Sequence, residues 1–501
     1  MAIGPSNRLA RLRAALIDPA RRERTVLILL VLYWVVWTAY GTMAKAPQGL
    51  HADMTEIIAW SRDLALGYLK HPPLAAWLAA GWFAVFPIAE WSYYALAMLM
   101  PVATLWIAWR LMADYLDAEK RVVGLALLTL VPFFNFHALK YNVNTVLMPT
   151  WAMTALWFLR SYRARDSGYA ALAGFGAALA MYGKYWSVFL IAGLVVAALV
   201  DRRRAAYFRS RAPWITVAVG LVVLAPHLRW LVDNNFAPFS YAMTVHGEKT
   251  FAVAAMSTLG YLAGSLGYVA LPLVVVLAMA RRPAVLADAA WPHDDDRRLA
   301  AAAFWAPLLL PVIAGIAGTT EITSLWSMSA WTLLPVVLLS PPALSIRPID
   351  TERLLGLAIA VPLVVLVASP AIAWFTRDKG QPAEVQGRLL AAEVDRDWHN
   401  LTPEPLAFVG GDADLAYAVV TWSRSRPRAL PGMPAPPAAE LSRDGFVIVC
   451  FAEDTGCKNN AAARAAEFPR HRVIESTILR GFWGKLGQPQ GYTINLVPPA
   501  R

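Results

Sequence analysis

Residues 51–74 read HADMTEIIAWSRDLALGYLKHPPL and hold a dense cluster of charged and titratable side chains. Apolar runs flank this stretch on both sides. Ionisable groups beside hydrocarbon are costly unless they are solvated or paired, so such a cluster indicates a functional site. We interpret the stretch as part of the first external loop, about residues 45–90, of a protein that crosses a membrane several times.

The composition agrees with a membrane protein. Of the 501 residues, 58% are hydrophobic and 16% are charged, whereas a soluble protein carries about 25% charged residues. The net charge of +11 would favour nucleic-acid binding in a soluble chain. Here the arginines lie between apolar runs and mark membrane orientation, so no nucleic-acid partner is expected. We expect no cleavable signal peptide, because residues 1–24 are rich in Arg and lack an apolar core.

Apolar runs suited to crossing about 30 Å of hydrocarbon lie before and after the loop. We predict about eleven membrane-spanning helices, which form an all-α polytopic domain over residues 25–375. Their predicted ranges are 25–44, 91–111, 122–136, 145–159, 169–182, 185–200, 213–231, 251–280, 299–318, 325–344 and 354–375.

Lys and Arg are distributed unequally between alternate loops. Most of them fall on the side of residues 1–24, which the positive-inside rule assigns to the cytoplasm. The loops of the opposite side carry few cations, namely Lys45, Arg62, Lys70, Lys140, Lys184 and Lys249. This asymmetry places loop 45–90 on the external side.

Two short amphipathic or apolar segments lie within this loop, at residues 54–67 and 72–86. The second would reach only about 22 Å as a helix, which is short for a membrane span. Proline suits the first turn of a helix, so we predict that Pro72 and Pro73 start it. Both segments are expected to lie on the membrane surface as interfacial helices.

Two carboxylates are candidates for the chemistry. Asp53 precedes the first interfacial helix, where a carboxylate can act as a general base for an acceptor hydroxyl or amine. Glu56 lies three residues later on the same helix face, as an auxiliary carboxylate, a metal ligand or a capping partner. The alternative is structural, because Asp53 with Glu56 is close to a capping box.

Cations near helix ends are candidates for binding a lipid-linked phosphate. Lys70 and His71 stand just before a predicted helix N-terminus, which attracts anions through its free N–H groups and its dipole. Lys140 and Lys184 lie at the external ends of predicted spans. Each lysine is alternatively a snorkelling residue that reaches the headgroups. His71 is alternatively a structural histidine or a ligand of a divalent metal ion, although no spacing motif supports a metal site.

Weaker candidates occur in later external loops. His227 and Arg229 lie at the end of a span, and a loop with His246, Glu248 and Lys249 follows. These residues are candidates for the acceptor site. Glu321 is a candidate second carboxylate or metal ligand. For each, an ordinary exposed loop residue is the alternative.

Residues 376–501 differ in character from the rest of the chain. The segment PLAFVGGDADLAYAVVTWS is typical of a strand, a turn and a helix, and GFVIVCF and YTINLVP are typical of strands. We therefore predict a small soluble α/β domain on the external side, in which the turn at Gly410, Gly411 and Asp412 is only a turn. Cys450 and Cys457 lie in this domain, either as a disulfide or as free thiols.

The quoted segments resemble one family. The Asp in the first external loop, GYLKHPPL, KYNVNT and LAMYGKYWS are similar to the bacterial GT-C fold glycosyltransferases of the protein mannosyltransferase-like group (families 39 and 83). That group includes the lipid A aminoarabinose transferase and the dolichyl-phosphate-mannose-dependent protein mannosyltransferases. The resemblance is strongest over residues 25–260. It departs in one place, because the family often follows the Asp directly with Glu, whereas Met54 follows Asp53 here.

The resemblance implies inverting transfer of a sugar from a polyprenyl-phosphate donor to an envelope acceptor on the periplasmic face of the inner membrane. Lipid A, lipopolysaccharide, another lipid, a glycan and a protein all stay open as acceptors. The family's catalytic Asp corresponds to Asp53, and its phosphate-facing or metal-binding position corresponds to Lys70 and His71. The rival interpretation is a transporter or flippase of a lipid-linked substrate, which predicts internal repeats and broken helices at the membrane midplane.

Overall fold

The computed structural model describes residues 5–247, 249–280 and 283–500. Its contacts divide the chain into two compact units. The membrane unit comprises the residues up to Thr38 and Ala97–Leu366, and the loop–sheet unit comprises Ala39–Leu96 and the residues from Val367 onward. The predicted external loop and the C-terminal domain therefore belong to one compact unit.

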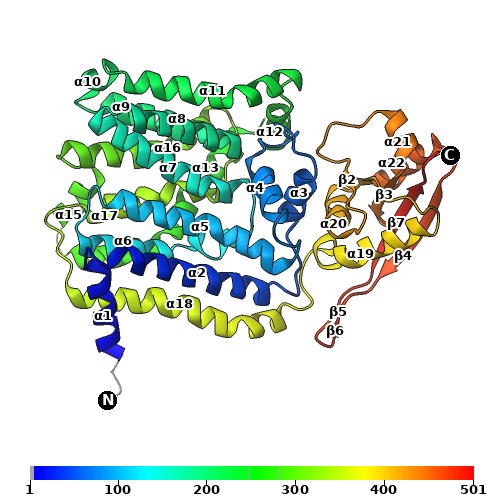
Figure 1. Ribbon diagram of the computed structural model, residues 1–501, viewed down its shortest axis with the longest axis horizontal. Helices are drawn as coiled ribbons and strands as arrows, with labels where there is room; N and C mark the ends of the chain where they lie inside the picture. Colours follow the sequence, from blue (N-terminus) through cyan, green and yellow to red (C-terminus); the bar gives the residue numbers. More distant parts are fainter. Residues whose placement is uncertain (1–4, 248, 281–282, 501) are drawn as a thin grey trace. The chain divides into compact units, whose positions relative to one another are not determined.

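The membrane unit is built from helices (Figure 1). Helices α2 and α18 end, and helix α5 begins, in residues assigned to the loop–sheet unit. The helices are α1 (Pro5–Ile17), α2 (Arg22–Ala44), α5 (Glu90–Met112), α6 (Ala118–Thr129), α7 (Val143–Ala164), α8 (Ser167–Gly183), α9 (Val188–Val200), α10 (Arg204–Phe208), α11 (Ala212–Asp233), α12 (Ala237–His246), α13 (Phe251–Tyr268), α14 (Ala270–Ala280), α15 (Pro283–Ala290), α16 (Asp295–Ala317), α17 (Leu334–Leu339) and α18 (Pro348–Phe375), with 3-10 segments η1 (Pro132–Phe134), η2 (His137–Leu139), η3 (Tyr185–Ser187) and η4 (Ser324–Leu333).

Several of these helices are suited to crossing a bilayer. Within the described part of the chain, five helices are long and apolar enough, or up to seven if two bent pairs each count as one span. The five are α2, α5, α11, α16 and α18. The chain is therefore a multi-pass membrane protein. The remaining predicted ranges fall on helices that are shorter or less apolar, so the number eleven stays a prediction.

One predicted span is not a single continuous helix. The range 251–280 is two helices, because α13 ends at Tyr268 and α14 begins at Ala270. Pro272 has no N–H to donate to the carbonyl of Tyr268, so an unbroken helix would lose a hydrogen bond there. The ranges 122–136 and 325–344 also combine a short α-helix with 3-10 segments.

Close packing in the membrane unit depends on small residues. Helix α8 packs along α7 and α11. A Cβ at Gly174 of α8 would collide with the carbonyl oxygen of Thr216 on α11. Small residues let helix backbones approach in a bilayer, where water supplies no hydrophobic force between helices.

The loop–sheet unit contains a five-stranded sheet of order β2-β1-β3-β7-β4. Strand β1 pairs in parallel with β2 and β3, and β7 pairs antiparallel with β3 and β4. The strands are β1 (Phe408–Gly411), β2 (Arg428–Ala429), β3 (Phe446–Phe451), β4 (Arg472–Ile478) and β7 (Gln490–Val497), with a hairpin of β5 (Gly481–Phe482) and β6 (Lys485–Leu486). The strands predicted in PLAFVGG, GFVIVCF and YTINLVP are thereby confirmed as β1, β3 and β7.

Helices complete this unit. They are α3 (Ala52–Ser61), α4 (Leu74–Phe83), α19 (Pro382–His399), α20 (Ala413–Trp422), α21 (Ala438–Asp444) and α22 (Thr455–Ala466). A buried core joins Val447, Val449 and Ile494 of the sheet to Trp398 of α19 and Tyr417 of α20.

The loop–sheet unit contains the predicted turn at Gly410–Asp412 and shows how the two cysteines are arranged. Gly411 adopts φ of 104°, and Asp412 caps α20 by accepting the backbone N–H of Leu415. Cys450 and Cys457 form a disulfide.

Candidate active site

Asp53 lies in the first turn of α3, and the residue that caps this helix is His51. The His51 Nδ1 accepts the backbone N–H of Asp53 at 3.1 Å. The capping role considered for Asp53 is therefore wrong, because the chain enters the helix two residues earlier than the capping-box pattern suggests. The Asp53 side chain is 39% exposed, with its Oδ1 3.6 Å from His51 Nδ1.

Helix α3 begins at Ala52 and ends at Ser61, whereas the sequence predicted residues 54–67. The Tyr68 hydroxyl explains the early end, since it lies 2.9 Å from the Trp60 carbonyl and 2.8 Å from the Asp63 carbonyl. The Tyr68 ring also stacks on Trp60 at 5.0 Å. The chain thus folds back immediately after α3.

The return segment brings Lys70 and His71 beside α3. The Lys70 Nζ lies 2.7 Å from Glu56 Oε1, and the His71 ring meets Trp60 edge-on at 6.0 Å. Helix α4 begins at Leu74, so the proline pair precedes the helix and does not form its first turn as predicted. Its ten residues span about 15 Å, which suits an interfacial helix.

The ion pair between Glu56 and Lys70 is largely removed from solvent. The side chains of Glu56 and Lys70 are 13% and 28% exposed. Burial raises the pKa of the Glu56 carboxyl group, while the positive charge of Lys70 opposes the rise. Taking a carboxylate out of water disfavours its charged form unless a cation compensates. The positive charge of Lys70 therefore stabilises the charged form of Glu56 in this partly buried position.

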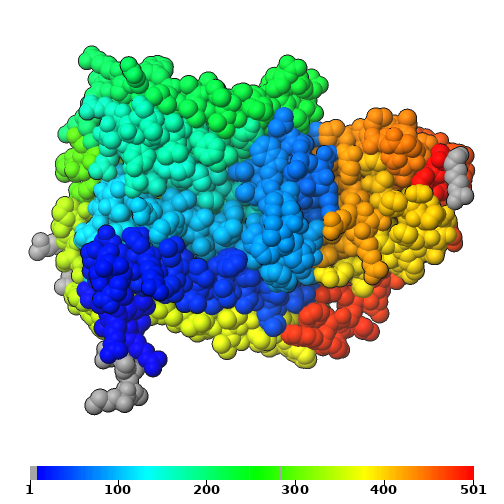
Figure 2. Space-filling model, viewed as in Figure 1, coloured from blue at the N-terminus to red at the C-terminus, as the bar shows by residue number. Residues whose placement is uncertain are grey.

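The C-terminal domain supplies further residues around α3. Figure 2 shows the loop (blue) in contact with residues of the C-terminal domain (orange), which belong to the same unit. The Glu384 Oε1 accepts the backbone N–H of Ala52 at 3.0 Å. Asp414, in the first turn of α20, is near enough to Asp53, His51 and Lys70 to interact with their charges.

The environment of Asp414 disfavours the charged form of its carboxyl group. Burial raises the pKa of Asp414, and the negative charges of Asp412 and Asp53 add to this, whereas Lys70 and His51 oppose it. Sequence reasoning missed both Asp414 and Glu384. The signal for Glu384 was its place three residues after Gln381 in QPAE, a helix-start pattern. Nothing in the sequence indicated that this helix start faces the start of α3.

The membrane unit holds the other predicted cations. Lys184 follows α8, and its Nζ donates to Asn144 Oδ1 at 2.9 Å. The same ammonium lies 4.5 Å from the centre of the Trp326 ring, a cation–π contact. Lys140 stands two residues before Asn142, which caps α7. Both lysines therefore lie at the N-terminal end of α7.

The weaker candidates occupy different surroundings. His227 is buried in α11, where its Nε2 lies 3.0 Å from the Tyr185 hydroxyl and its ring stacks on Trp230. Arg229 is exposed and pairs with Asp233 at 2.9 Å. The Glu321 backbone N–H donates to the His246 carbonyl at 2.9 Å, which joins the segment after α16 to the end of α12.

The predicted residues thus form two groups. Asp53, Glu56, Lys70 and His71 come together in the loop–sheet unit, and the other predicted residues that the structure describes lie in the membrane unit. Glu248 lies outside the described residues. Within the described ranges, no group of three His, Cys, Asp or Glu side chains is arranged to hold a metal ion. The metal alternative therefore has no ligand set in this part of the chain.

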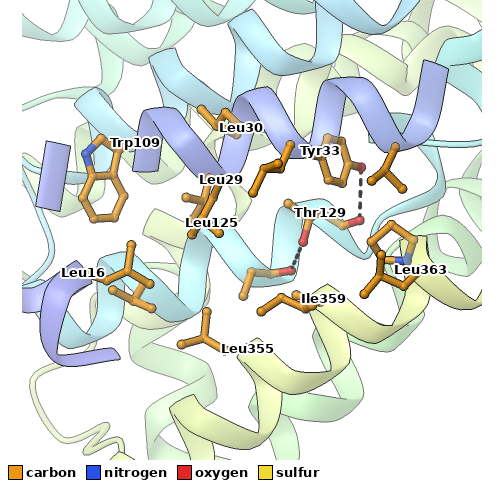
Figure 3. A pocket seen from close by; sticks show the side chains of 16 residues that line it. Leu16, Leu29, Leu30, Tyr33, Trp109, Leu125, Thr129, Leu355, Ile359 and Leu363 are labelled. Atoms are coloured by element: carbon orange, nitrogen blue, oxygen red, sulfur yellow. Dashed lines mark hydrogen bonds between the residues drawn. The ribbon is translucent and has the colours of Figure 1, made fainter. Parts of the chain in front are cut away.

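An apolar cavity of about 350 Å³ lies in the membrane unit between α2, α6 and α18 (Figure 3). Leu29, Leu125 and Leu355 point into it, and the Tyr33 hydroxyl beside it lies 3.4 Å from the Thr129 carbonyl. Its lining suits hydrocarbon and offers no group for catalysis.

The sequence is similar to known membrane enzymes. Residues 70–230 match the family of dolichyl-phosphate-mannose-protein mannosyltransferases. The lipopolysaccharide core galacturonosyltransferase RgtB of Rhizobium johnstonii is 26% identical over 416 residues, which cover 78% of this chain and 80% of that protein. The lipid A galacturonosyltransferase RgtD of the same organism is 26% identical over 215 residues, or 42% of this chain and 44% of that protein.

Solved structures of ArnT from Cupriavidus metallidurans are similar in fold. The structure bound to undecaprenyl phosphate has a TM-score of 0.59 at 14% identity and covers 93% of this chain and 97% of that one. The apo structure has a TM-score of 0.61 at 13% identity and covers 94% and 97%. This likeness confirms the predicted GT-C fold, whereas the number of spans and the periplasmic side of the C-terminal domain stay predictions.

Proposed function

We propose that this chain, a GT-C fold glycosyltransferase related to the lipid A aminoarabinose transferase, transfers a sugar from a polyprenyl-phosphate donor to an acceptor of the cell envelope. The observation that carries the proposal is the grouping of Asp53 with the partly buried pair of Glu56 and Lys70 in one loop. A carboxylate beside a cation is what the reaction needs at an acceptor hydroxyl and a donor phosphate.

The proposed chemistry is a single inverting displacement. Asp53 takes the proton of the acceptor hydroxyl or amine while the acceptor atom forms a bond to the anomeric carbon of the sugar. The bond from that carbon to the phosphate oxygen breaks, and its electron pair stays on the polyprenyl phosphate. Cations aimed at this developing charge stabilise the transition state more than the ground state.

The roles of the other residues follow from charge. Lys70 and His71 face the donor phosphate, with Glu56 holding Lys70 in place. Lys140 and Lys184, at the start of α7, supply further positive charge for the phosphate. His227, Arg229 and Glu321 are assigned to the acceptor side. Membrane lipids surround the donor tail.

The acceptor and the location are also part of the proposal. Relatives named for lipopolysaccharide core and lipid A support an acceptor of that class. The distribution of Lys and Arg supports a cytoplasmic N-terminus in the inner membrane and a periplasmic C-terminal domain. The disulfide of Cys450 and Cys457 agrees with an oxidising compartment.

The decisive experiment compares Asp53→Asn with Asp63→Asn in a strain that lacks the endogenous gene. Asp63 is a matched control, because it lies in the same loop, is 38% exposed and pairs with Arg428 at the surface. Mass spectrometry of envelope lipids should show a sugar modification with wild type and Asp63→Asn. We expect Asp53→Asn, at equal membrane levels, to lower the transfer rate by about 10²–10⁴-fold.

Two results would overturn the proposal. One is normal sugar transfer by Asp53→Asn. The other is translocation of a lipid-linked substrate by wild type with no new glycosidic bond, which would favour the transporter interpretation.

A further inference from the structure

The N-terminus of α3 is held by two residues, one before it in sequence and one from the C-terminal domain. His51 Nδ1 accepts the N–H of Asp53 at 3.1 Å, and Glu384 Oε1 accepts the N–H of Ala52 at 3.0 Å. The first N–H groups of a helix have no partner within the helix. Here the N–H groups of Ala52 and Asp53 are both bound by side chains.

The Glu384 carboxylate is mostly buried and lies at the N-termini of two helices. Its side chain is only 15% exposed, and it lies in the first turn of α19. Each helix N-terminus carries a partial positive charge of about half an elementary charge. The carboxylate therefore faces the positive ends of α3 and α19 together and fixes the two helices to each other.

The same carboxylate acts on His51. The Glu384 Oε1 lies 4.0 Å from His51 Nε2. Because Nδ1 accepts the N–H of Asp53, the proton of a neutral imidazole is on Nε2, which faces Glu384. Glu384 thus favours the His51 tautomer that caps α3, in addition to binding Ala52 directly.

We propose that Glu384 is a positioning residue for Asp53, so that the C-terminal domain is an integral part of the transferase site. This inference rests on the proposed function, in which Asp53 is the base. Glu384 does not contact a substrate; it fixes the backbone that carries Asp53. A small displacement of a catalytic group is costly, because reacting atoms must be aligned within a fraction of an ångström.

The test uses the full-length protein in lipid nanodiscs with four variants. They are Glu384→Ala, Glu384→Gln, His51→Ala and the double variant of Glu384→Ala with His51→Ala. Glu467→Ala is the matched control, because Glu467 is 56% exposed and pairs with Arg464 at the surface, after the end of α22. The donor probe is undecaprenyl-phosphate-linked galacturonic acid, and the acceptor probe is purified lipid A.

We expect Glu384→Ala to lower kcat by about 100-fold while KM for the donor changes by less than about threefold. Glu384→Gln keeps an oxygen acceptor for Ala52 and should recover most of this loss. The double variant should lose less than the product of the two single losses, because both residues hold the same helix end. Glu467→Ala should match wild type.

Hydrogen exchange of residues 50–56 gives a readout independent of activity. Glu384→Ala should exchange faster there, and Glu467→Ala should not. An unchanged kcat in Glu384→Ala overturns the proposal even if exchange increases, because the position of Asp53 would then not depend on Glu384. If wild type itself transfers no sugar from any polyprenyl-phosphate donor, the proposed function fails, while exchange still reports whether Glu384 holds α3.

Discussion

The Lys70 ammonium lies 2.7 Å from the Glu56 carboxylate, although 14 residues separate them in sequence. The pair closes the turn that follows α3 and holds a cation beside the helix that carries Asp53. Both charges are partly buried, so neither can be removed without leaving the other poorly solvated. This relationship makes Lys70 important for stability as well as for the proposed phosphate binding.

Replacing Lys70 by Met should destabilise the loop–sheet unit in a pH-dependent way. Burial already raises the pKa of Glu56, and Lys70 opposes that rise, so the variant raises the pKa further. A carboxyl group with a raised pKa in the folded state stabilises the fold at low pH, and this contribution is lost as pH rises through the folded pKa. The deficit in Tm relative to wild type should therefore grow from about pH 4 to about pH 8.

The size of the effect should be about 1–3 kcal/mol at neutral pH, as for a lost hydrogen bond to a charged group. Thermal unfolding in detergent at several pH values measures it. Lys70→Arg keeps the charge and should behave like wild type. A deficit in Lys70→Met that does not change with pH contradicts the assigned role of Glu56.

Reducing the disulfide of Cys450 and Cys457 should weaken the sheet domain without stopping catalysis. The bond joins β3 to the first turn of α22 across seven positions. A disulfide that closes so short a loop stabilises the fold by about 2 kcal/mol, because it lowers the conformational entropy of the unfolded chain. We expect the Tm of wild type in reductant to fall to that of the double variant Cys450→Ser with Cys457→Ser. An unchanged Tm after complete reduction contradicts this prediction.

Replacing Lys184 by Met should weaken donor binding more than it slows the chemistry. Lys184 is fixed by Asn144 and by the Trp326 ring, so its charge has a defined position at the start of α7. Loss of one charged hydrogen bond to phosphate should raise KM for the donor by about 10–100-fold. Steady-state kinetics with Lys184→Arg as control measure the effect. An unchanged KM would show that Lys184 does not bind the donor phosphate and instead reaches the lipid headgroups.

The sequence identified those parts of the fold that depend on local pattern. Continuous apolar runs such as 446–451 predicted buried central strands. Strand β4 was missed, because its residues alternate between exposed and partly buried at the edge of the sheet. Apolar composition likewise could not show that α13 and α14 are separate, although Pro272 was a signal for the break.

The candidate site shows the same limit. The cluster of Asp53, Glu56 and Lys70 was visible because the three residues are close in sequence. The partner of Ala52 is Glu384, 332 positions away. No periodicity or motif links such distant residues, because the contact depends on how the C-terminal domain packs against the loop. The role of that domain therefore required the structure.

Gly49→Ala should reproduce the effect of losing Glu384. Gly49 has φ of 72°, and a Cβ there would collide with the backbone carbonyl of Glu384. The collision should push α19 away from the start of α3 and break the bond from Ala52 to Glu384. We expect faster hydrogen exchange in residues 50–56 and a fall in kcat comparable with that of Glu384→Ala.

Gly484→Ala is the control that separates the collision from backbone strain. Gly484 lies in the same unit with φ of 74°, but a Cβ there would meet nothing within 4 Å. Both variants cost about 1 kcal/mol in backbone conformation, because L-residues rarely adopt this region. Only Gly49→Ala displaces Glu384. Equal kcat and equal exchange at residues 50–56 in the two variants would show that the contact between α19 and α3 does not control Asp53.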